Sequence, residues 1–392
     1  MYFSVNGKGI TQIIVKTYTS LRFSQNSSMI KSAFKSILCL VVLFLFFTVS
    51  VAPRKANAAS PLKITALGKT YIFYPPQISL SSGEFTLNGI DEIVDRVYQD
   101  TLVKPINAEL SFTPSDINNF SIMKEKSGVE IDRARLKAEI IYALDSGKRQ
   151  ITAKSQTVTP SVTSDYLKEE TVKRAEFSTA YATSSIERKH NIELACKSLN
   201  GAIIDLYGGF SFNERVGVRT EERGYKQAKI ILDGKFTDGL GGGVCQVSTT
   251  LYNAALRAGL NIKEYHRHSL AVSYVPPSFD AMVSGTSCDL RLENNTGRNI
   301  YVKAAADGKK ITITLFGIKP DCEYRFRSVV DEVIFAEIKK VPAGSGEPLI
   351  SPKNGLKSTG YMDVYRDNRL IASYKLRTDR YSPINGVVEE SE

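Results

Sequence analysis

The sequence predicts a multi-domain α+β protein in which a β-rich domain places a cysteine at the start of a helix. Three observations predict it. Short runs of β-branched and aromatic residues, such as 71–74 and 108–112, alternate with a few amphipathic helical segments. A glycine-rich stretch, 239–243, comes directly before a helical segment that includes Cys245. The chain has 392 residues, which is enough for two or three domains with cores of their own.

The N-terminal segment has the order of a secretory signal peptide. Lys31 and Lys35 precede an apolar run over 37–52, and the small residues 56–58 follow it. The apolar run is at or below the minimum length for a bilayer span. We therefore assign 1–58 to a leader that is cleaved at its end or retained as an anchor. The rest of the chain is then exported, to the wall or the extracellular space.

Charge and cysteine content restrict the class of protein. The formal net charge of +10 is spread along the chain without a basic stripe interleaved with aromatics, so nucleic acid is not an expected partner. A positive excess outside the cell suits an anionic wall, and it equally serves solubility. Cys39 belongs to the leader, and the four remaining cysteines are too few for a disulfide framework. A pair between Cys288 and Cys322 stays open.

Residues 60–165 are expected to form a small α+β accessory domain. Besides the two runs named above, 157–163 is an expected strand. The segment 131–144 is an expected helix because its apolar residues recur at helical spacing. No group of catalytic residue types gathers here. A charged stretch, 166–176, is the expected linker to the next domain.

Residues 177–317 are expected to form the main domain. Its first helix carries an apolar stripe at i, i+3, i+4 and i+7, and it ends at Asn200-Gly201. Cys196 lies in this stripe, so we assign it to the core. The tail, 328–392, is expected to be a small β module with a hairpin that turns at Asp367-Asn368.

The candidate nucleophile is Cys245. So much glycine before it cannot form regular structure, and the apolar stripe after it predicts a helix that stops at Gly259. At a helix start, unpaired N–H groups and the helix dipole lower the pKa of a thiol from about 8.5. Gly242 and Gly243 would let a substrate approach the backbone, and the N–H groups of Cys245 and Gln246 would form an oxyanion hole. The alternative is a structural turn with a half-buried thiol.

Two histidines follow closely and are the candidates for the general base. In a strand over 265–275, His266, His268 and Tyr274 would share one face. A cysteine at a helix start, a histidine on the next strand and then an acidic partner is the chain order of papain-like hydrolases and transferases. Two acidic residues could orient the imidazole: Asp280 and Asp289. A zinc site made by the two histidines and the cysteine is the competing interpretation.

The residues around these candidates resemble the VanW domain family. The resemblance covers about 140 residues, roughly 177–317, and its most specific part is the run GGGVCQVSTTLYNAAL, which begins at Gly241. The other matching segments are Phe210-Ser211-Phe212-Asn213, Gly217-Val218-Arg219-Thr220, Gly224-Tyr225, His268-Ser269, Tyr274-Val275-Pro276-Pro277, Asp280-Ala281 and Asn294-Asn295-Thr296-Gly297. The region upstream resembles the peptidoglycan-binding domain that often precedes this family. The tail weakly resembles a glycine-marked surface module of wall-bound proteins.

The resemblance implies a cell-wall function. The family is associated with vancomycin-resistance clusters, and some members are held to be cysteine L,D-transpeptidases, which form 3-3 cross-links in peptidoglycan. It implies that Cys245 attacks a stem tetrapeptide and releases D-alanine, and that a side-chain amine of a second stem resolves the thioester. His268 matches the family's His-Ser pair and is the implied base. The residues expected to bind substrate are Arg219, Gly242, Gly243, Gln246, His266 and Tyr274.

Two departures from the family pattern leave the third catalytic residue open. Ser278 stands where the family commonly has glycine after the prolines, and Cys288 adds a thiol beside Asp289. The expected partners are peptidoglycan stem peptides and glycan, with the membrane involved only through an uncleaved leader. No cofactor or metal is expected, and we expect a monomer. The alternative function is that of a non-catalytic protein that binds peptidoglycan or assists vancomycin resistance.

Overall fold

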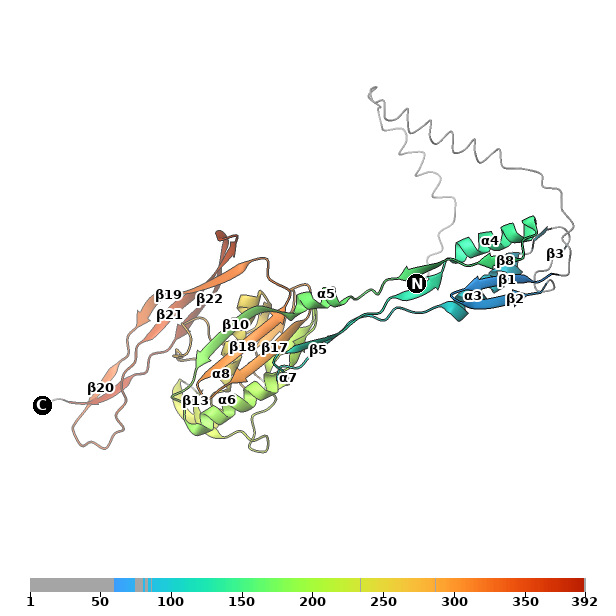
Figure 1. Ribbon diagram of the computed structural model, residues 1–392. Helices are drawn as coiled ribbons and strands as arrows, with labels where there is room; N and C mark the ends of the chain where they lie inside the picture. The colour runs from blue at the N-terminus through green and yellow to red at the C-terminus, as the bar shows by residue number, and fades with distance from the viewer. Residues whose placement is uncertain are drawn as a thin grey trace, which may run out of the picture. The chain divides into compact units, whose positions relative to one another are not determined.

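The structure is a computed structural model that describes residues 60–74, 80–81, 84–85, 87–232, 234–285 and 287–390. The expected leader lies outside the described residues. The chain divides into two compact units (Figure 1): one holds 60–97 with Arg133–Lys154, and the other holds Tyr98–Asp132 with the chain from Ser155 onward. The predicted α+β class is confirmed, with 41% strand and 22% helix. No helix in these ranges is long and apolar enough to cross a bilayer.

The first unit combines a three-stranded sheet with helices. β1 (Leu62–Ala66) pairs antiparallel with β2 (Lys69–Phe73) and parallel with β8 (Gln150–Thr152). α3 (Leu87–Thr101) begins in this unit, and α4 (Arg133–Ser146) is the helix predicted over 131–144. A short ladder joins β3 (Leu80–Ser81) to β4 (Glu84–Phe85). The core contains alternate residues of β1 and one face of α4: Leu62, Ile64, Leu136 and Ile140.

The second unit takes up part of the expected N-terminal domain. β5 (Glu109–Phe112) pairs with β6 (Phe120–Met123), and β7 (Gly128–Ile131) pairs with β9 (Ser155–Val158). The expected strand over 157–163 is therefore formed only at its beginning. Pro160 has no N–H to donate, which prevents the ladder from continuing.

The expected linker, 166–176, is regular structure instead. α5 (Ser164–Lys168) begins after Thr163, whose hydroxyl accepts a hydrogen bond from the N–H of Tyr166 at 3.2 Å. A 3-10 turn, η2 (Glu169–Thr171), leads into β10 (Val172–Ala180), an edge strand of the main sheet. The charged residues that suggested a linker lie mostly on the solvent side of these elements, as polar residues of an edge strand do.

The main sheet has the antiparallel order β10-β18-β17-β11, formed with β18 (Lys310–Gly317), β17 (Ile300–Ala306) and β11 (Ala202–Ile204). α6 (Ile186–Leu199) and α8 (Val244–Ala258) pack on it (Figure 1), and their contacts with the sheet form the core. Cys196 lies in that core, as predicted. The opposite face carries an aromatic cluster: Phe112, Phe120, Tyr301 and Phe316.

Smaller elements surround α8. β12 (Gly209–Ser211), β16 (Arg291–Glu293) and β15 (Asn261–Glu264) form a three-stranded sheet, and α7 (Phe212–Val216) follows β12. β13 (Gln227–Leu232) and β14 (Lys235–Leu240) form an antiparallel pair that leads directly into the glycine-rich stretch.

The strand expected over 265–275 is absent, so that prediction is wrong. β15 ends at Glu264, and the chain then follows an irregular path until β16. The N–H of His268 donates to a carboxylate oxygen of Asp280 at 2.7 Å, and the carbonyl of His266 accepts from the N–H of Met282 at 2.7 Å. Backbone groups that would pair with a neighbouring strand are therefore used within the loop.

The C-terminal sheet consists of β19 (Glu323–Ile334), β21 (Gly355–Arg366) and β22 (Arg369–Tyr381), in that order. β20 (Ile338–Val341) pairs in parallel with β23 (Gly386–Glu389). The predicted hairpin is confirmed, because β21 and β22 turn at Asp367-Asn368 with φ values of 49° and 61°. Two positive φ values are what a two-residue type I′ turn requires.

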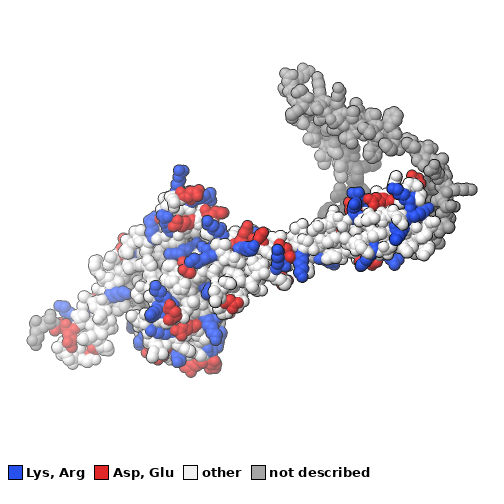
Figure 2. Space-filling model, in the orientation of Figure 1, with Lys and Arg blue, Asp and Glu red and all other residues white. Residues whose placement is uncertain are grey.

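Charged side chains are mixed in sign over the surface. On the face that Figure 2 shows, Lys and Arg side chains alternate with Asp and Glu over the described elements. The net charge of +10 is thus distributed, as the sequence predicts, and is not gathered into one basic patch on this face.

Candidate active site

Cys245 is the second residue of α8, and it is one of only two residues of that helix that are not buried, the other being Arg257. The helix begins after Gly243, whose φ of 109° favours glycine. The backbone N–H of Cys245 has no acceptor among the described residues, whereas the N–H of Gln246 donates to the carbonyl of Gly243 at 3.0 Å. One of the two expected oxyanion donors is therefore available, and the other is occupied.

The glycines before Cys245 are required by packing within the protein. A β-carbon on Gly242 would lie 2.8 Å from the backbone of β13. A β-carbon on Gly241 would lie 2.8 Å from the side chain of Arg219, and one on Gly243 would lie 3.1 Å from that of Arg188. Packing within the protein is thus one reason for these glycines; Gly243 also lines the pocket described below, and a substrate contact at Gly242 and Gly243 stays a prediction.

Gln246 is engaged inside the protein. Its buried side-chain amide donates to the carbonyl of Ala180 at 2.8 Å and to the hydroxyl of Thr179 at 3.1 Å. Its side-chain oxygen accepts from Arg188 at 2.9 Å. With hydrogen bonds at both ends of the amide, Gln246 anchors the start of α8 to β10; it also lines the pocket, and its contact with a substrate stays a prediction.

His268 is paired with Asp280 in the irregular segment after β15. Its Nδ1 lies 2.8 Å from Oδ2 of Asp280, and both side chains are buried, with 6% and 1% of their surface exposed. A carboxylate can only accept, so Nδ1 carries the hydrogen and Nε2 is left for the thiol. The sequence left the third residue open between two aspartates, and Asp280 is the one that contacts the imidazole.

Polar residues of α8 hold the backbone on either side of Asp280. Ser248 donates to the carbonyl of Ala281 at 2.6 Å, and the hydroxyl of Thr249 accepts from the N–H of Ala281 at 2.9 Å. Asn253 donates to the carbonyl of Phe279 at 2.8 Å. The helix that carries Cys245 therefore also fixes the carboxylate that orients its histidine. Sequence reasoning missed these buried polar residues because it followed only the apolar stripe.

The thiol and the imidazole shift each other's pKa values. Burial raises the pKa of Cys245, but a hydrogen bond with His268 and the charge of that ring outweigh it and lower the pKa overall. Burial opposes the charged form of His268, but hydrogen bonds to Asp280 and Cys245 prevail and raise its pKa to about 9. Each charged form therefore favours the other, a thiolate on Cys245 and an imidazolium on His268. In its neutral form the thiol donates to the carbonyl of Val283 at 3.3 Å.

Two other candidates lie apart from this chain of contacts. The carboxylate of Asp289 accepts from the hydroxyl of Ser211 at 2.5 Å and from the N–H of Asn213 at 2.9 Å, so it stabilises the start of α7 and is not the partner of a histidine. His266 Nε2 lies 2.8 Å from Glu264 Oε1. Cys288 and Cys322 are both free thiols, so the pair between them that the sequence left open is not formed.

A pocket of about 1250 Å³ opens beside Cys245. Its lining includes His266, His268 and Tyr274 from the loop after β15, Arg188 from α6 and Arg219 from the segment after α7. The described residues contain no group of three His, Cys, Asp or Glu side chains that could hold a metal ion. The competing zinc interpretation therefore has no ligand set within these ranges.

The two arginines bring uncompensated positive charge to the pocket. Arg219 donates to the side-chain oxygen of Asn213 at 2.7 Å, and Arg188 donates to Ser184 at 2.8 Å and to Gln246. Neither forms an ion pair with a carboxylate of the described residues. Burial lowers the pKa of both guanidinium groups, which marks them as partly desolvated cations.

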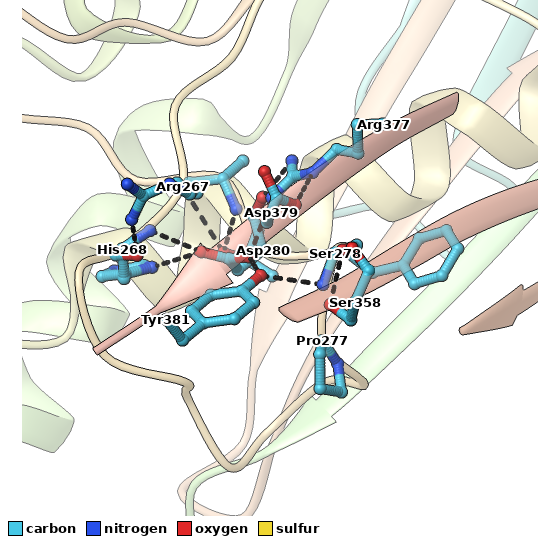
Figure 3. A network of polar contacts seen from close by, with 12 residues as sticks. Arg267, His268, Pro277, Ser278, Asp280, Ser358, Arg377, Asp379 and Tyr381 are labelled. Carbon is cyan, nitrogen blue, oxygen red and sulfur yellow. Dashed lines mark hydrogen bonds and ion pairs between the residues drawn. The ribbon is translucent and has the colours of Figure 1, made fainter. Parts of the chain in front are cut away.

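Sequence reasoning also missed residues of the C-terminal sheet at this site. Arg377 and Tyr381, both from β22, hydrogen-bond to Oδ1 of Asp280 at 2.9 Å and 2.6 Å (Figure 3). One sequence signal existed: Arg377, Asp379 and Tyr381 lie at period two along a strand, and all three are buried.

Ser278 keeps the backbone conformation of the glycine that the family commonly has there. Its φ is 65°, in the left-handed region, and its hydroxyl donates to the carbonyl of Ser358 in β21 at 3.0 Å. The departure from the family pattern is thus accommodated without displacing Asp280 from His268.

Two family models match the chain: one described as "VanW like protein" matches residues 187–316, and one described as "Putative peptidoglycan binding domain" matches residues 63–152. The uncharacterized protein YoaR of Bacillus subtilis (strain 168) is 32% identical over 255 residues, which cover 64% of this chain and 77% of that protein. This chain belongs to the VanW-like family. The resemblance stated from the sequence is thereby confirmed.

A second VanW-like relative is the vancomycin B-type resistance protein VanW of Enterococcus faecalis (strain ATCC 700802 / V583). It is 31% identical over 141 residues, which cover 34% of this chain and 51% of that protein. The crystal structure of HP0197-G5 matches 18% of the chain and 100% of its own length at 22% identity, with a TM-score of 0.11, which supports no statement about the fold. A VanW-like domain together with a peptidoglycan-binding domain indicates a cell-wall-associated role with peptidoglycan as partner.

Proposed function

We propose that the protein is a cysteine acyltransferase that acts on peptidoglycan stem peptides as an L,D-transpeptidase and forms 3-3 cross-links. One observation carries the proposal: Cys245, at the start of a helix, lines the same pocket as His268, whose ring is hydrogen-bonded to Asp280. The matches to VanW-like and peptidoglycan-binding families support a stem peptide as the substrate. The site then works outside the cell, after export directed by residues 1–58.

In the acylation step, the thiolate of Cys245 attacks the carbonyl carbon next to the terminal D-alanine of a donor tetrapeptide. The oxyanion that forms accepts a hydrogen bond from the backbone N–H of Cys245. His268 donates the proton on Nε2 to the nitrogen of the breaking amide bond, so D-alanine leaves and a thioester remains. Asp280 holds the ring through Nδ1 and stabilises its charged form.

In the transfer step, the side-chain amine of a second stem attacks the thioester. His268, now neutral, takes a proton from the attacking amine, a new amide bond forms, and the thiolate of Cys245 leaves. The imidazolium and thiolate of the starting state are restored. Water entering in place of the amine would give hydrolysis by the same route, so access to the pocket decides between the two outcomes.

The arginines of the pocket suit the free carboxylate at the end of the donor stem. Arg219 packs beside Gly241 and Arg188 beside Gly243, and neither has an acidic partner among the described residues. A guanidinium binds a carboxylate with two parallel hydrogen bonds. We propose that Arg219, with Arg188, holds this carboxylate and so brings the adjacent amide to the thiol. His266 and Tyr274 remain proposed substrate contacts, since both line the pocket.

A binding role without turnover is the second candidate, and the match to a peptidoglycan-binding domain favours it. The two candidate functions are distinguished by incubating purified protein with disaccharide tetrapeptides and identifying the products by mass spectrometry. Turnover predicts free D-alanine and dimers with 3-3 cross-links, both lost in Cys245→Ala and both kept in the matched control Cys322→Ala. Absence of both products from the wild-type reaction, with wall binding intact, would favour the binding role.

A further inference from the structure

The C-terminal sheet reaches the proposed active site through a single carboxylate. Arg377 donates through one terminal nitrogen to Oδ1 of Asp280 at 2.9 Å and through the other to the backbone oxygen of the same residue at 2.8 Å. Tyr381 donates to the same Oδ1 at 2.6 Å. Both residues belong to β22 and lie 97 and 101 residues further along the chain (Figure 3).

These contacts supply hydrogen-bond donors to Oδ1 of Asp280, the carboxylate oxygen that His268 does not contact. Oδ2 accepts the backbone N–H and the Nδ1–H of His268, and among the described residues Oδ1 accepts only from β22. A buried carboxylate that lacks partners takes up a proton, because burial penalises its charged form. Without Arg377 and Tyr381, Asp280 would have no donor at Oδ1 among the described residues.

We propose that Arg377 and Tyr381 are positioning residues that keep Asp280 ionised and aimed at His268, so that the C-terminal sheet is part of the active centre. The proposal rests on the proposed function only in taking Cys245 as the reactive group. It gives this sheet a role beyond that of a wall-surface module.

The charges along the contact path alternate in sign. They run from the Asp379 carboxylate through Arg377, Asp280 and His268 to the Cys245 thiolate. Burial raises the pKa of Asp280, but the hydrogen bond from His268 and the charge of Arg377 outweigh it and hold that pKa below its usual value. Removing this cation favours protonation of Asp280, and a neutral Asp280 no longer stabilises the imidazolium that lowers the thiol pKa, so the thiolate becomes less favourable.

The other cations near the path, Arg188 and Arg219, face Cys245 at its far end and do not contact Asp280. The ionisable side chains that face Asp280 and His268 are Cys245 and Tyr252 from α8, Tyr265 and Tyr274 from the loop, and Arg377, Asp379 and Tyr381 from β22. Two of the tyrosines, Tyr265 and Tyr252, lie with their ring centroids 4.6 Å and 5.7 Å from the guanidinium of Arg377 and hold it in place. Arg377 is therefore the positive charge that balances Asp280 from the side away from His268.

The test is the rate at which iodoacetamide alkylates Cys245, measured against pH in the full chain. Arg377→Met should move the lower inflection of the profile upward by about one pH unit, which means about tenfold less thiolate on the acid side. Arg377→Lys, which keeps the charge and loses the forked geometry, should recover most of that shift. Tyr381→Phe should move the inflection in the same direction by less.

Arg380→Met is the matched control, because Arg380 is the exposed neighbour on the other face of β22. Its profile should superimpose on that of the wild type. Near-UV circular dichroism establishes that each variant is folded; if Arg377→Met does not fold, the smaller change in Tyr381→Phe decides. Folded Arg377→Met and Tyr381→Phe proteins with wild-type profiles would overturn the proposal. If the variant profiles are shifted from that of the wild type but the wild type makes no cross-links, the proposed function alone is refuted.

Discussion

One oxygen atom of Asp280 holds His268 in two places. Oδ2 accepts the backbone N–H of His268 at 2.7 Å and its Nδ1–H at 2.8 Å. The first contact fixes where the residue sits, and the second fixes the ring and its tautomer. Nε2 is left to contact Cys245, so a loop without strand pairing still presents a histidine in one orientation.

The choice of His268 over His266 as the base is the first prediction. His268→Ala should lower cross-linking activity about a hundredfold or more, the usual size of general acid–base catalysis. It should also move alkylation of Cys245 to higher pH, because the imidazolium that lowers the thiol pKa is gone and burial, which raises it, remains. His266→Ala should do much less, since that ring contacts Glu264. A larger upward shift in His266→Ala than in His268→Ala would reverse the assignment.

The pH dependence of the wild type is the second prediction. The thiol pKa lies below its usual value and that of His268 is raised to about 9, so the thiolate–imidazolium pair exists between these two limits. Acylation, measured as initial release of D-alanine, should fall as the thiolate is protonated on the acid side. It should fall again above about pH 9, where His268 loses the proton that the leaving amine needs. A profile that keeps rising through pH 10 would contradict an acid role for His268.

The third prediction concerns the carboxylate of the donor stem. Arg219→Met should raise KM for a tetrapeptide donor about tenfold to a hundredfold, the size expected for a lost hydrogen bond to a charged group. A donor with a terminal amide should bind the wild type weakly and should be little affected by the substitution. Arg215→Met, which alters an exposed residue of α7, is the control. An equal rise in KM for the carboxylate donor and the amide donor would exclude carboxylate recognition by Arg219.

The fourth prediction is that substitution of Cys196 affects stability, whereas substitution of Cys245 affects activity. Burial raises the pKa of Cys196 to about 12, so a thiol-directed probe should leave it unlabelled in the folded protein while it labels Cys245 quickly. Cys196→Ala should lower the free energy of unfolding by about 1 kcal/mol and spare activity. Cys245→Ala should abolish activity with little change in denaturant midpoint. Rapid labelling of Cys196 in native protein would show that this core is not closed.

Local sequence patterns predicted the elements whose causes are local. The glycine run and the helical stripe after it placed Cys245 at a helix start, and two turn-forming residues placed the hairpin at Asp367-Asn368. The position of His268 depends instead on a carboxylate twelve residues away that captures its backbone N–H, which no alternation of residue types encodes. The contribution of Arg377 depends on contact across 97 residues, so its inward-facing pattern gave no hint of its target.

Charge content misled the interpretation at one place, and glycine content left it incomplete at another. The charged stretch 166–176 continues α5, forms η2 and ends in β10, an edge strand that leaves polar side chains in solvent. Gly242 is needed where β13 passes close to the loop, a contact between segments that sequence spacing does not reveal. In both cases the long-range partner, and not the local composition, determines the structure.

The fifth prediction assigns wall binding to the first unit, whose residues come from two stretches of the chain that flank part of the second. A simple N-terminal truncation therefore cannot isolate the second unit. Ile140→Asp buries a charge in the core of the first unit and should unfold it, which reduces co-sedimentation with insoluble wall while Cys245 keeps its alkylation rate. Tyr142→Asp, on the exposed side of α4, should leave both properties unchanged. Undiminished sedimentation of Ile140→Asp protein with an unfolded first unit would refute this assignment.

The central claim is that Cys245 carries the acyl group. Intact-mass spectrometry of the wild type, quenched in acid soon after mixing with a tetrapeptide donor and no acceptor amine, tests it directly. We predict an adduct whose mass is that of the donor minus D-alanine, mapped by peptide digestion to Cys245, discharged by hydroxylamine and absent from Cys245→Ala. An adduct that persists in Cys245→Ala, or D-alanine release by that variant at the wild-type rate, would contradict the mechanism.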